Sequence, residues 1–510
     1  MKLREYHAPR WSEPIVHELS TMGERGFIPP GAEPEIKEKV GPAEALVPDA
    51  MRRRTPPGLP ELSQIRVLRH YLRLSQMTLG METGVHIGVG TCTMKYSPKV
   101  NEALAAMMAD VHPLQPEETM QGVLGMAYEF GDVFLREISG MDAFTYQPPG
   151  GSAGCYNNAL IMRKYHRDNG EPERDEVVTT IFSHPCDAAA PATAGFKVIT
   201  LYPDPETGLP STEALKEAVG PRTAGVFVTN PEDTGIFNPR IEEFVSVVHD
   251  AGGLCAYDQA NANGVLGITR ARDAGFDLCH FNLHKTFSSP HGCGGPGGGA
   301  SGVTEELARF LPVPLVEYDG ERYYLDYDRP DSVGKLRPFY GYAPVVLRAY
   351  AWVMSLGAEG LREVAEIAVL NNNYLLNKML EIRGVSAPYA KGKRRIEQVR
   401  YSWEELARET GVHSEELGIR AADFGVHYWT SHHPFVVPEP CTLEPTESFS
   451  KDDLDEYVTI MKHVAHEART NPELVKTAPH NSTIHAIDHS PLDDPSQWAM
   501  TWRAYRRKVG

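Results

Sequence analysis

A lysine at position 285 ends a short apolar stretch and is followed by a glycine-rich segment. The sequence around it reads FNLHKTFSSPHGCGGPGGGASG over residues 281–302. A lysine at a strand end is usually a solvent-facing charge, and this interpretation stays open. The alternative is a Schiff-base lysine, whose amine lies in a pocket and binds an aldehyde. The glycines favour the alternative, because they let the backbone approach a ligand closely.

An aspartate precedes this lysine by 27 residues, in the segment LCAYDQANANG. Asp258 follows a short apolar run, so it is expected at the C-terminal end of a strand, where open α/β sheets bind ligands. It could also be an ordinary N-cap or turn residue. Pyridoxal phosphate (PLP) needs such a carboxylate, because a buried acid paired with its pyridine nitrogen keeps that nitrogen protonated. Lys285 and Asp258 could therefore face the two ends of one PLP ring.

Two further segments could complete a PLP site. QPPGGSAGCYNNALIMRKYH, residues 147–166, is a glycine-rich turn that leads into a helical pattern. Its backbone N–H groups and the Ser152 hydroxyl could hold a phosphate. His184 follows the apolar run VVTTIF, where it is either a loop residue or a ring stacked on the pyridine. The predicted cofactor-binding set consists of Lys285, Asp258, His184, Gly151, Ser152, Ala153, Asn261, His284 and Thr286, with Lys285 and His184 also predicted to be catalytic.

Other catalytic motifs are missing from the sequence. It contains no Gly-x-Ser-x-Gly turn, no Walker loop and no His-Glu-x-x-His metal site. His284 and the pair at 432–433 lack the spacing of metal ligands, so no metal is predicted.

The elements that must position these residues follow an alternating pattern. Apolar runs rich in β-branched residues predict strands at 177–182, 197–202, 224–229, 254–258 and 278–283. An amphipathic helix is predicted at 241–253, between two of these runs. Strand, helix and strand at this spacing indicate a βαβ unit, so we expect an α/β protein with a mostly parallel central sheet.

Local composition and residue patterns along the chain predict three regions. Residues 1–90 are rich in proline and charge and suit an extended arm. Residues 91–340 would form the large PLP-binding domain, and residues 341–510 a smaller C-terminal α/β domain. Within the latter, Ser402 stands three residues before Glu405, which predicts a capping box at the start of a surface helix.

Composition excludes several classes of partner. The chain has 510 residues and a formal charge of -18, which disfavours binding to nucleic acid and to anionic membranes. Its seven cysteines form no Cys-x-x-Cys pair, which suggests free thiols; a redox role of Cys293 is left open. The polar N-terminus does not resemble a signal peptide, so a cytoplasmic location is expected.

Six segments, in their order along the chain, resemble the catalytic half of the glycine cleavage system P-protein in its split form. They are TPPGLPELSQIRVLRHYLRLSQM (55–77), GTCTMKYSP (90–98), HPLQPEETMQG (112–122), TNPEDTGIF (229–237), NLHKTFSSPHGCGGPG (282–297) and EPTES (444–448). The resemblance implies the fold type I of PLP enzymes, as in aspartate aminotransferase. It also implies that Lys285 is the Schiff-base lysine, that Asp258 pairs with the pyridine nitrogen and that His184 stacks on the ring.

The implied reaction is PLP-dependent decarboxylation of glycine, with transfer of the aminomethyl group to the lipoyl arm of the H-protein. The implied assembly is an α2β2 complex of this β subunit (subunit 2) with an α subunit (subunit 1). A third interpretation, a non-catalytic scaffold like the α half, is disfavoured because Lys285 and Asp258 are both retained.

The chain also departs from the family pattern near the expected substrate. Ala153 and Cys155 stand where the family typically has histidine and glutamate, and the segment 185–187 reads Pro-Cys-Asp. Residues 391–425 look inserted relative to compact members. A divergent fold type I enzyme acting on another small amino acid is therefore the alternative function.

Overall fold

The computed structural model describes residues 3–89, 92–93, 95–291, 297–429, 436–483, 488 and 490–509. The chain divides into two compact units. Unit 1 comprises Met1–Arg4 and Gly80–Lys476, and unit 2 comprises Glu5–Leu79 and Thr477–Gly510. The proposed boundaries at about residues 90 and 340 remain predictions. None of the described helices is both long and apolar enough to cross a membrane.

A seven-stranded sheet forms the centre of unit 1, in the order β2-β8-β7-β6-β5-β3-β4. Its strands are β2 (Ala143–Thr145), β3 (Glu176–Thr180), β4 (Lys197–Leu201), β5 (Thr223–Thr229), β6 (Leu254–Gln259), β7 (Leu278–Asn282) and β8 (Gly299–Val303). All five predicted strands are present, and β3 to β7 pair in parallel; β8 is antiparallel to both of its neighbours. The prediction of a mostly parallel sheet is confirmed.

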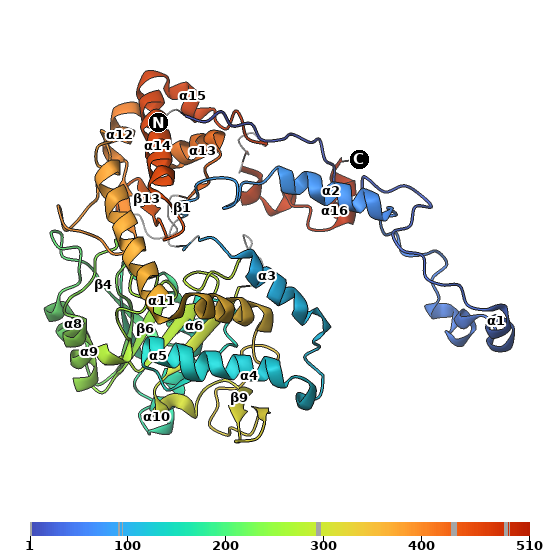
Figure 1. The fold of residues 1–510 in the computed structure, drawn as a ribbon, viewed down its shortest axis with the longest axis horizontal. Coiled ribbons are helices and arrows are strands. Elements are labelled where there is room, and N and C mark those ends of the chain that lie inside the picture. The colour runs from blue at the N-terminus through green and yellow to red at the C-terminus, as the bar shows by residue number, and fades with distance from the viewer. Residues whose placement is uncertain are drawn as a thin grey trace. The chain divides into compact units, whose positions relative to one another are not determined.

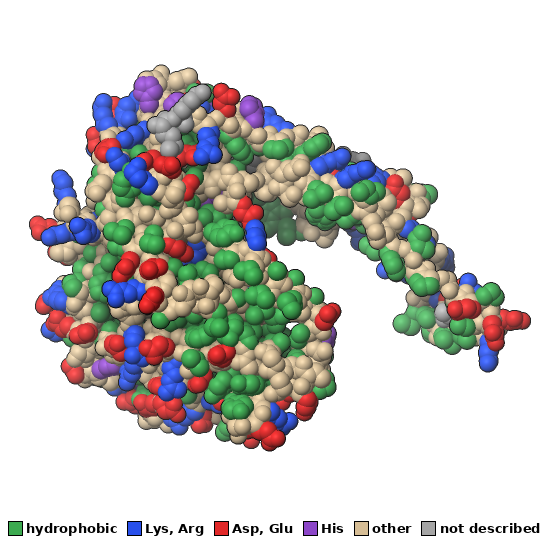
Figure 2. All heavy atoms as spheres, viewed as in Figure 1, with side chains coloured by type: hydrophobic (Ala, Val, Ile, Leu, Met, Phe, Trp, Pro, Cys, Tyr) green, Lys and Arg blue, Asp and Glu red, His purple; other side chains and the backbone are tan. Residues whose placement is uncertain are grey.

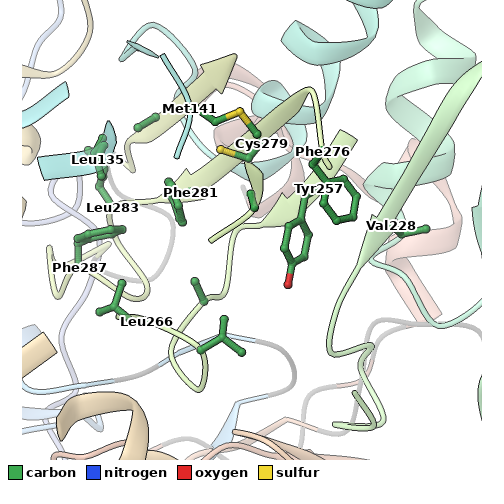
Figure 3. Close-up of a cluster of buried hydrophobic side chains, with 14 of the residues drawn as sticks. Leu135, Met141, Val228, Tyr257, Leu266, Phe276, Cys279, Phe281, Leu283 and Phe287 are labelled. Atoms are coloured by element: carbon green, nitrogen blue, oxygen red, sulfur yellow. The ribbon is translucent and has the colours of Figure 1, made fainter. Parts of the chain in front are cut away.

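Both faces of this sheet are buried, because successive side chains of each strand enter different cores. Cys255 and Tyr257 belong to the core that contains α9 and α11, whereas Ala256 between them belongs to the core that contains α6. Figure 3 shows part of the first core, where the rings of Tyr257 and Phe276 stack with centroids 4.5 Å apart.

Helices cover the two faces of the sheet (Figure 1). The predicted helix at 241–253 is α9, which covers one face together with α11. The helices of this part are α3 (Lys99–Ala106), α4 (Gln121–Glu129), α5 (Arg136–Ser139), α6 (Gly151–Asp168), α7 (Cys186–Thr193), α8 (Thr212–Ala218), α9 (Ile241–Asp250) and α10 (Glu305–Ala308). A π-helical segment, Phe130–Leu135, joins α4 to α5, and a hairpin of β9 (Leu315–Tyr318) and β10 (Tyr323–Asp326) follows α10.

The rest of unit 1 has its own hydrophobic core, built around α14 and the pair β11 and β13. The long helix α11 contributes to this core and to the sheet core that also contains α9, and it kinks at Gly357, whose φ of 66° suits glycine. The elements are β1 (Gly88–Val89), α11 (Ala343–Met379), β11 (Val399–Ser402), α12 (Glu404–Thr410), α13 (Ser414–Ala421), β12 (Tyr428–Trp429), β13 (Pro440–Leu443), α14 (Lys451–Thr470) and α15 (Pro472–Lys476).

The predicted capping box at Ser402 is wrong. Ser402 ends strand β11, where its hydroxyl donates to the carbonyl of Pro438 at 2.6 Å, and Trp403 is the N-cap of α12. Strand pairing of β11 with β13 thus overrides the local signal.

Unit 2 contains α1 (Pro34–Val40), α2 (Gln64–Gln76) and α16 (Trp502–Val509) and buries few side chains. His70 is the buried residue of α2, and its Nδ1 lies 2.8 Å from the carboxylate of Glu13. The apolar side chains of α2 are instead exposed; Leu68 is 53% and Leu72 52% exposed. Such a helix leaves apolar surface open to solvent.

Candidate cofactor site

An open cavity lies in unit 1 at the carboxyl edge of the central sheet. Four of the predicted site residues line it: Lys285, Asp258, His184 and Asn261. Its other lining residues are Thr229, Pro231, Asp233, Ala260, Glu397 and Gln398. The fold thus brings together predicted residues that are far apart in the sequence; His184 and Lys285 are 101 positions apart.

Sheet topology explains this convergence. The chain runs from β3 outward to β4 and then returns to the other side of β3 as β5. Parallel sheets bind ligands outside the strand ends at such a reversal. Asp258 stands level with Thr229 on β5 and His280 on β7, so it lies in the middle of this edge.

Asp258 is buried but held in its ionised form. His280 Nε2 lies 3.1 Å from its Oδ1, and the Ala260 N–H donates to the same oxygen at 2.8 Å. Burial raises the pKa of Asp258, but the imidazoles of His280 and His184 and the Ala260 amide outweigh it and hold the pKa well below its ordinary value. The cavity therefore has a carboxylate that is ready to pair with a cationic group.

A second carboxyl group, that of Asp187, lies behind Asp258 and was not predicted. Its Oδ1 accepts a hydrogen bond from Cys155 Sγ at 3.2 Å, and the side chain is fully buried. Burial and the nearby charge of Asp258 raise the pKa of Asp187 well above its ordinary value. The pair therefore consists of one ionised and one neutral carboxyl, as expected where two acids share a buried site.

The start of α6 lies next to the cavity, because Gly151 packs against Ala260, which is one of the lining residues. An added Cβ on Gly151 would lie 3.4 Å from Ala260 Cβ and 3.0 Å from Asn282 Nδ2, so only glycine fits this approach without displacing a neighbour. Gly150 is the N-cap and offers no side-chain cap to the first N–H groups of α6, which include those of Ser152 and Ala153. The first N–H groups of a helix have no partner within it, and together they attract anions. The residues therefore fit the phosphate group of PLP.

The two neighbours of Lys285 hold its turn in place. Thr286 Oγ1 accepts a hydrogen bond from the Ala262 N–H at 2.9 Å, and His284 Nδ1 lies 3.0 Å from the carbonyl of Gly298. These contacts tie the lysine turn to the segments after β6 and before β8. That His284 and Thr286 also bind the cofactor stays a prediction, as do the other assigned roles. Cys293 and the pair at 432–433 lie outside the described residues.

A buried lysine supports the same turn, although no role was predicted for it. Lys95 Nζ donates to the carbonyl of Thr286 at 2.8 Å and to Asn263 Oδ1 at 2.6 Å. It also pairs with the Glu447 carboxylate at 3.0 Å and lies 4.5 Å from the centroid of the Trp352 ring. Lys95 and Glu447 fall within two of the segments that resemble the P-protein, GTCTMKYSP and EPTES.

The segment 391–425, which looked inserted, is part of the cavity wall. Glu397 and Gln398 line the cavity, and Arg400 pairs with Asp233 at 3.2 Å. Burial and the neighbouring Glu444 raise the pKa of Glu397 well above its ordinary value. The Oε2 of Glu397 and the Oε1 of Gln398 have no hydrogen-bond partner among the described residues, so both could contact a polar ligand.

The raised pKa of Glu232, which lies beside this wall, should make the free energy of unfolding depend on pH. Its buried carboxyl accepts a hydrogen bond from Thr180, and burial raises its pKa from 4.5 to about 8. Between pH 4.5 and about 8 the folded chain keeps a proton on Glu232 that the unfolded chain releases. The contribution of this group to the free energy of unfolding is therefore fully present below pH 4.5 and is lost as the pH rises to about 8. Glu232→Gln should therefore raise the free energy of unfolding at pH 9, by an amount on the order of a few kcal/mol. Urea unfolding at pH 5 and 9 tests this; a pH dependence equal to that of the wild type would contradict it.

Two known families match parts of this chain. Residues 151–295 match the family described as "Aminotransferase class-V", and residues 364–489 match "Glycine dehydrogenase, C-terminal domain". The "Probable glycine dehydrogenase (decarboxylating) subunit 2" of Pyrococcus abyssi is 44% identical over 505 residues, covering 98% of each chain. The protein of the same name from Pyrococcus furiosus is 45% identical over 506 residues, also covering 98% of each chain.

Solved structures agree on the fold. The glycine decarboxylase (P-protein) of the glycine cleavage system, in inhibitor-bound form, matches with a TM-score of 0.71 and 24% identity. The match covers 86% of this chain and all of that one. The prediction of the fold type I of PLP enzymes is thus confirmed. With near-complete coverage by relatives that are 44% and 45% identical, the chain belongs to the family of glycine dehydrogenase (decarboxylating) subunit 2.

Proposed function

We propose that this chain decarboxylates glycine with the help of PLP and passes the aminomethyl group to the lipoyl arm of an H-protein. The observation that carries the proposal is the meeting of Lys285, Asp258 and His184 in one cavity at the carboxyl edge of the sheet. Membership of the subunit 2 family supports glycine over another small amino acid as the substrate.

The cavity residues divide the work of holding the cofactor. Lys285 would bind the aldehyde carbon through its amine, and the N-terminus of α6 with Ser152 would hold the phosphate. The ionised Asp258 would accept a hydrogen bond from the ring nitrogen and keep it protonated. Bound in this way, PLP would supply an electron sink for the pair of electrons left when the carboxylate departs.

The remaining cavity residues would orient the substrate and limit water. His184, which lines the cavity, would pack its imidazole against the cofactor ring. Glu397 and Gln398 line the cavity, and one side-chain oxygen of each has no hydrogen-bond partner among the described residues, so both would be available to position the amino group of a small amino acid. These walls would limit the access of bulk water, which would otherwise protonate the reacting carbon.

An isotope exchange assay tests this function. The purified chain, supplied with PLP, subunit 1 and lipoylated H-protein, should exchange labelled bicarbonate into the carboxyl group of glycine. Alanine and serine, tested in parallel, should exchange far more slowly. No exchange with glycine when every partner is present, or faster exchange with another amino acid, would contradict the proposal.

A partner subunit is also supported by exposed apolar surface. In unit 2, the exposed side of α2 carries Leu68, Tyr71 and Leu72. In unit 1, Figure 2 shows hydrophobic side chains gathered on the side that carries α3 and α4. The residues exposed on these elements and next to them include Val100, Met107, Leu114 and Val133. Apolar side chains gathered on the surface of each unit in this way mark protein interfaces, and the proposed occupant is subunit 1 in an α2β2 complex.

The helix α2 offers a test of this assembly. Replacing both Leu68 and Leu72 with glutamate should weaken binding to subunit 1 by about 10-fold or more, because charges replace two interface side chains. The melting temperature of the isolated chain should stay the same, since both side chains are exposed. Glu217→Lys on the charged helix α8 serves as the control. Unchanged co-elution of the double variant with subunit 1 would contradict the prediction.

A further inference from the structure

Two cysteine thiols face each other behind the cavity and have no part in the proposed reaction. Sγ of Cys155 in α6 and Sγ of Cys186 in α7 are 3.1 Å apart, and both side chains are buried. Both are free thiols. Cys255, in contrast, is a buried thiol that contacts a backbone carbonyl, that of Val245, at 3.8 Å.

A histidine connects this pair to the cavity. Nδ1 of His184, which lines the cavity, accepts a hydrogen bond from the Cys186 N–H at 3.2 Å and lies 2.9 Å from Cys186 Sγ. A ring nitrogen that accepts from an amide carries no proton, so the Cys186 thiol must be the donor to it. His184 therefore provides a base that can take the proton of the thiol.

We propose that Cys155 and Cys186 are a modification site, a dithiol that a peroxide converts to an intramolecular disulfide. A peroxide entering through the cavity is attacked by the Cys186 sulfur while His184 holds the thiol proton. The O–O bond breaks, and the leaving oxygen takes up that proton and departs as water. The Cys155 sulfur then attacks the resulting sulfenic acid, whose S–O bond breaks, and a second water leaves with the Cys155 proton. Two thiols and one peroxide thus give one disulfide and two waters.

The carboxyl groups around the pair make this reaction slow. The hydrogen bond with Cys155 lowers the pKa of the Cys186 thiol, but burial and the charge of Asp258 outweigh it and raise the pKa to about 11. Little thiolate is present at neutral pH, so oxidation should accelerate as the pH rises. The pair therefore suits slow modification by peroxide and not a step of each catalytic turnover.

The alternative function of these side chains is to bind a metal cation. Ligand atoms of Cys155, Cys186, Asp187 and Asp258 lie within 4.8 Å of one another. However, a tetrahedral Zn²⁺ with Zn–S bonds of about 2.3 Å would hold its two sulfurs about 3.8 Å apart. The observed 3.1 Å is shorter. A disulfide needs the sulfurs to approach by only about 1 Å more, so the geometry favours the disulfide.

Formation of the disulfide should lower the affinity for PLP. This consequence rests on the proposed function, whereas the disulfide itself does not. Cys155 lies on α6, which begins at Gly151, and Cys186 begins α7 two residues after His184. Binding geometry tolerates displacements of only about 0.5 Å. Cys155 would also lose the S–H that it donates to Asp187. Loss of one buried hydrogen bond corresponds to roughly 10-fold in Kd, and this is the expected weakening.

Mass spectrometry of the full-length chain tests the modification. The reduced chain is treated with hydrogen peroxide, alkylated under denaturing conditions and digested with trypsin. We expect a cross-linked peptide pair joining Cys155 to Cys186, which dithiothreitol reverses. Cys255→Ser should leave the cross-link unchanged, whereas Cys186→Ser should abolish it. The measurement on the wild type stands even if a variant does not fold.

The opposing outcomes are equally distinct. Oxidation of the partly exposed Cys92 without any Cys155–Cys186 cross-link would overturn the proposal. Retention of one zinc ion per chain that prevents cross-linking would also overturn it. PLP retention, measured by absorbance after gel filtration, is a separate readout. If the reduced chain binds no PLP, the proposed function fails but the cross-link result stands; if oxidised and reduced chains retain PLP equally, only the effect on the cofactor is overturned.

Discussion

The Lys285→Ala variant is expected to lose glycine–bicarbonate exchange by at least about 10³-fold, the scale of losing a central catalytic group. Lys285 lines the cavity at the end of β7, and it is the amine that is placed to bind an aldehyde there. Its turn is fixed from both sides by Ala262 and Gly298. Removal of the amine should therefore leave the cavity in shape but without its covalent anchor. The absorbance band of the lysine-bound cofactor should disappear together with the exchange.

Two companion variants separate the amine from the charge. Lys285→Arg keeps a positive charge but cannot form the bond to the aldehyde, so it should be about as inactive as the alanine variant. Lys197→Ala removes an exposed lysine of β4 and should change neither absorbance nor exchange. Circular dichroism and melting curves establish that each variant is folded. Retention of the absorbance band by Lys285→Ala would show that PLP is held elsewhere.

Local sequence patterns were sufficient to predict the five parallel strands of the sheet and the region of the candidate site, but not β2 and the antiparallel β8. The parallel strands are buried on both faces, so their apolar runs stand out against the polar segments between them. Asp258 and Lys285 follow two such runs directly, and strand ends in a parallel sheet meet at one edge. The positions of these two residues could therefore be predicted from chain order alone.

Residues whose roles arise from pairing between distant segments could not be predicted. Asp187 gains its raised pKa only because folding places it near Asp258. Glu397 comes from a segment that looked like an insertion, and no periodic pattern connects it to the cavity. Ser402 shows the opposite error, since a valid local capping signal was overridden when β11 paired with β13. In each case the deciding contact lies far away in sequence.

Asp258→Asn is expected to lower the exchange rate by about 10²–10³-fold, the loss found when one preorganised electrostatic group is removed from an active site. The carboxylate is ionised in the folded chain because His280, His184 and the Ala260 amide together outweigh burial. Asparagine keeps the size of the side chain but cannot hold the cofactor ring nitrogen in its protonated form. PLP should therefore still bind to Lys285, with a changed absorbance spectrum and a slow reaction.

Asp187→Asn provides the matched control, because it makes the same chemical change close to the same place. The Asp187 carboxyl already holds its proton, since its pKa is raised well above the ordinary value by burial and by Asp258. Its replacement with asparagine leaves the charge of the site unchanged, and the exchange rate should fall far less than in Asp258→Asn. Exchange rates and absorbance spectra measured on both variants test whether the charge on Asp258 supports the reaction. Equal losses would mean that packing around the two carboxyls, and not the charge on Asp258, supports the reaction.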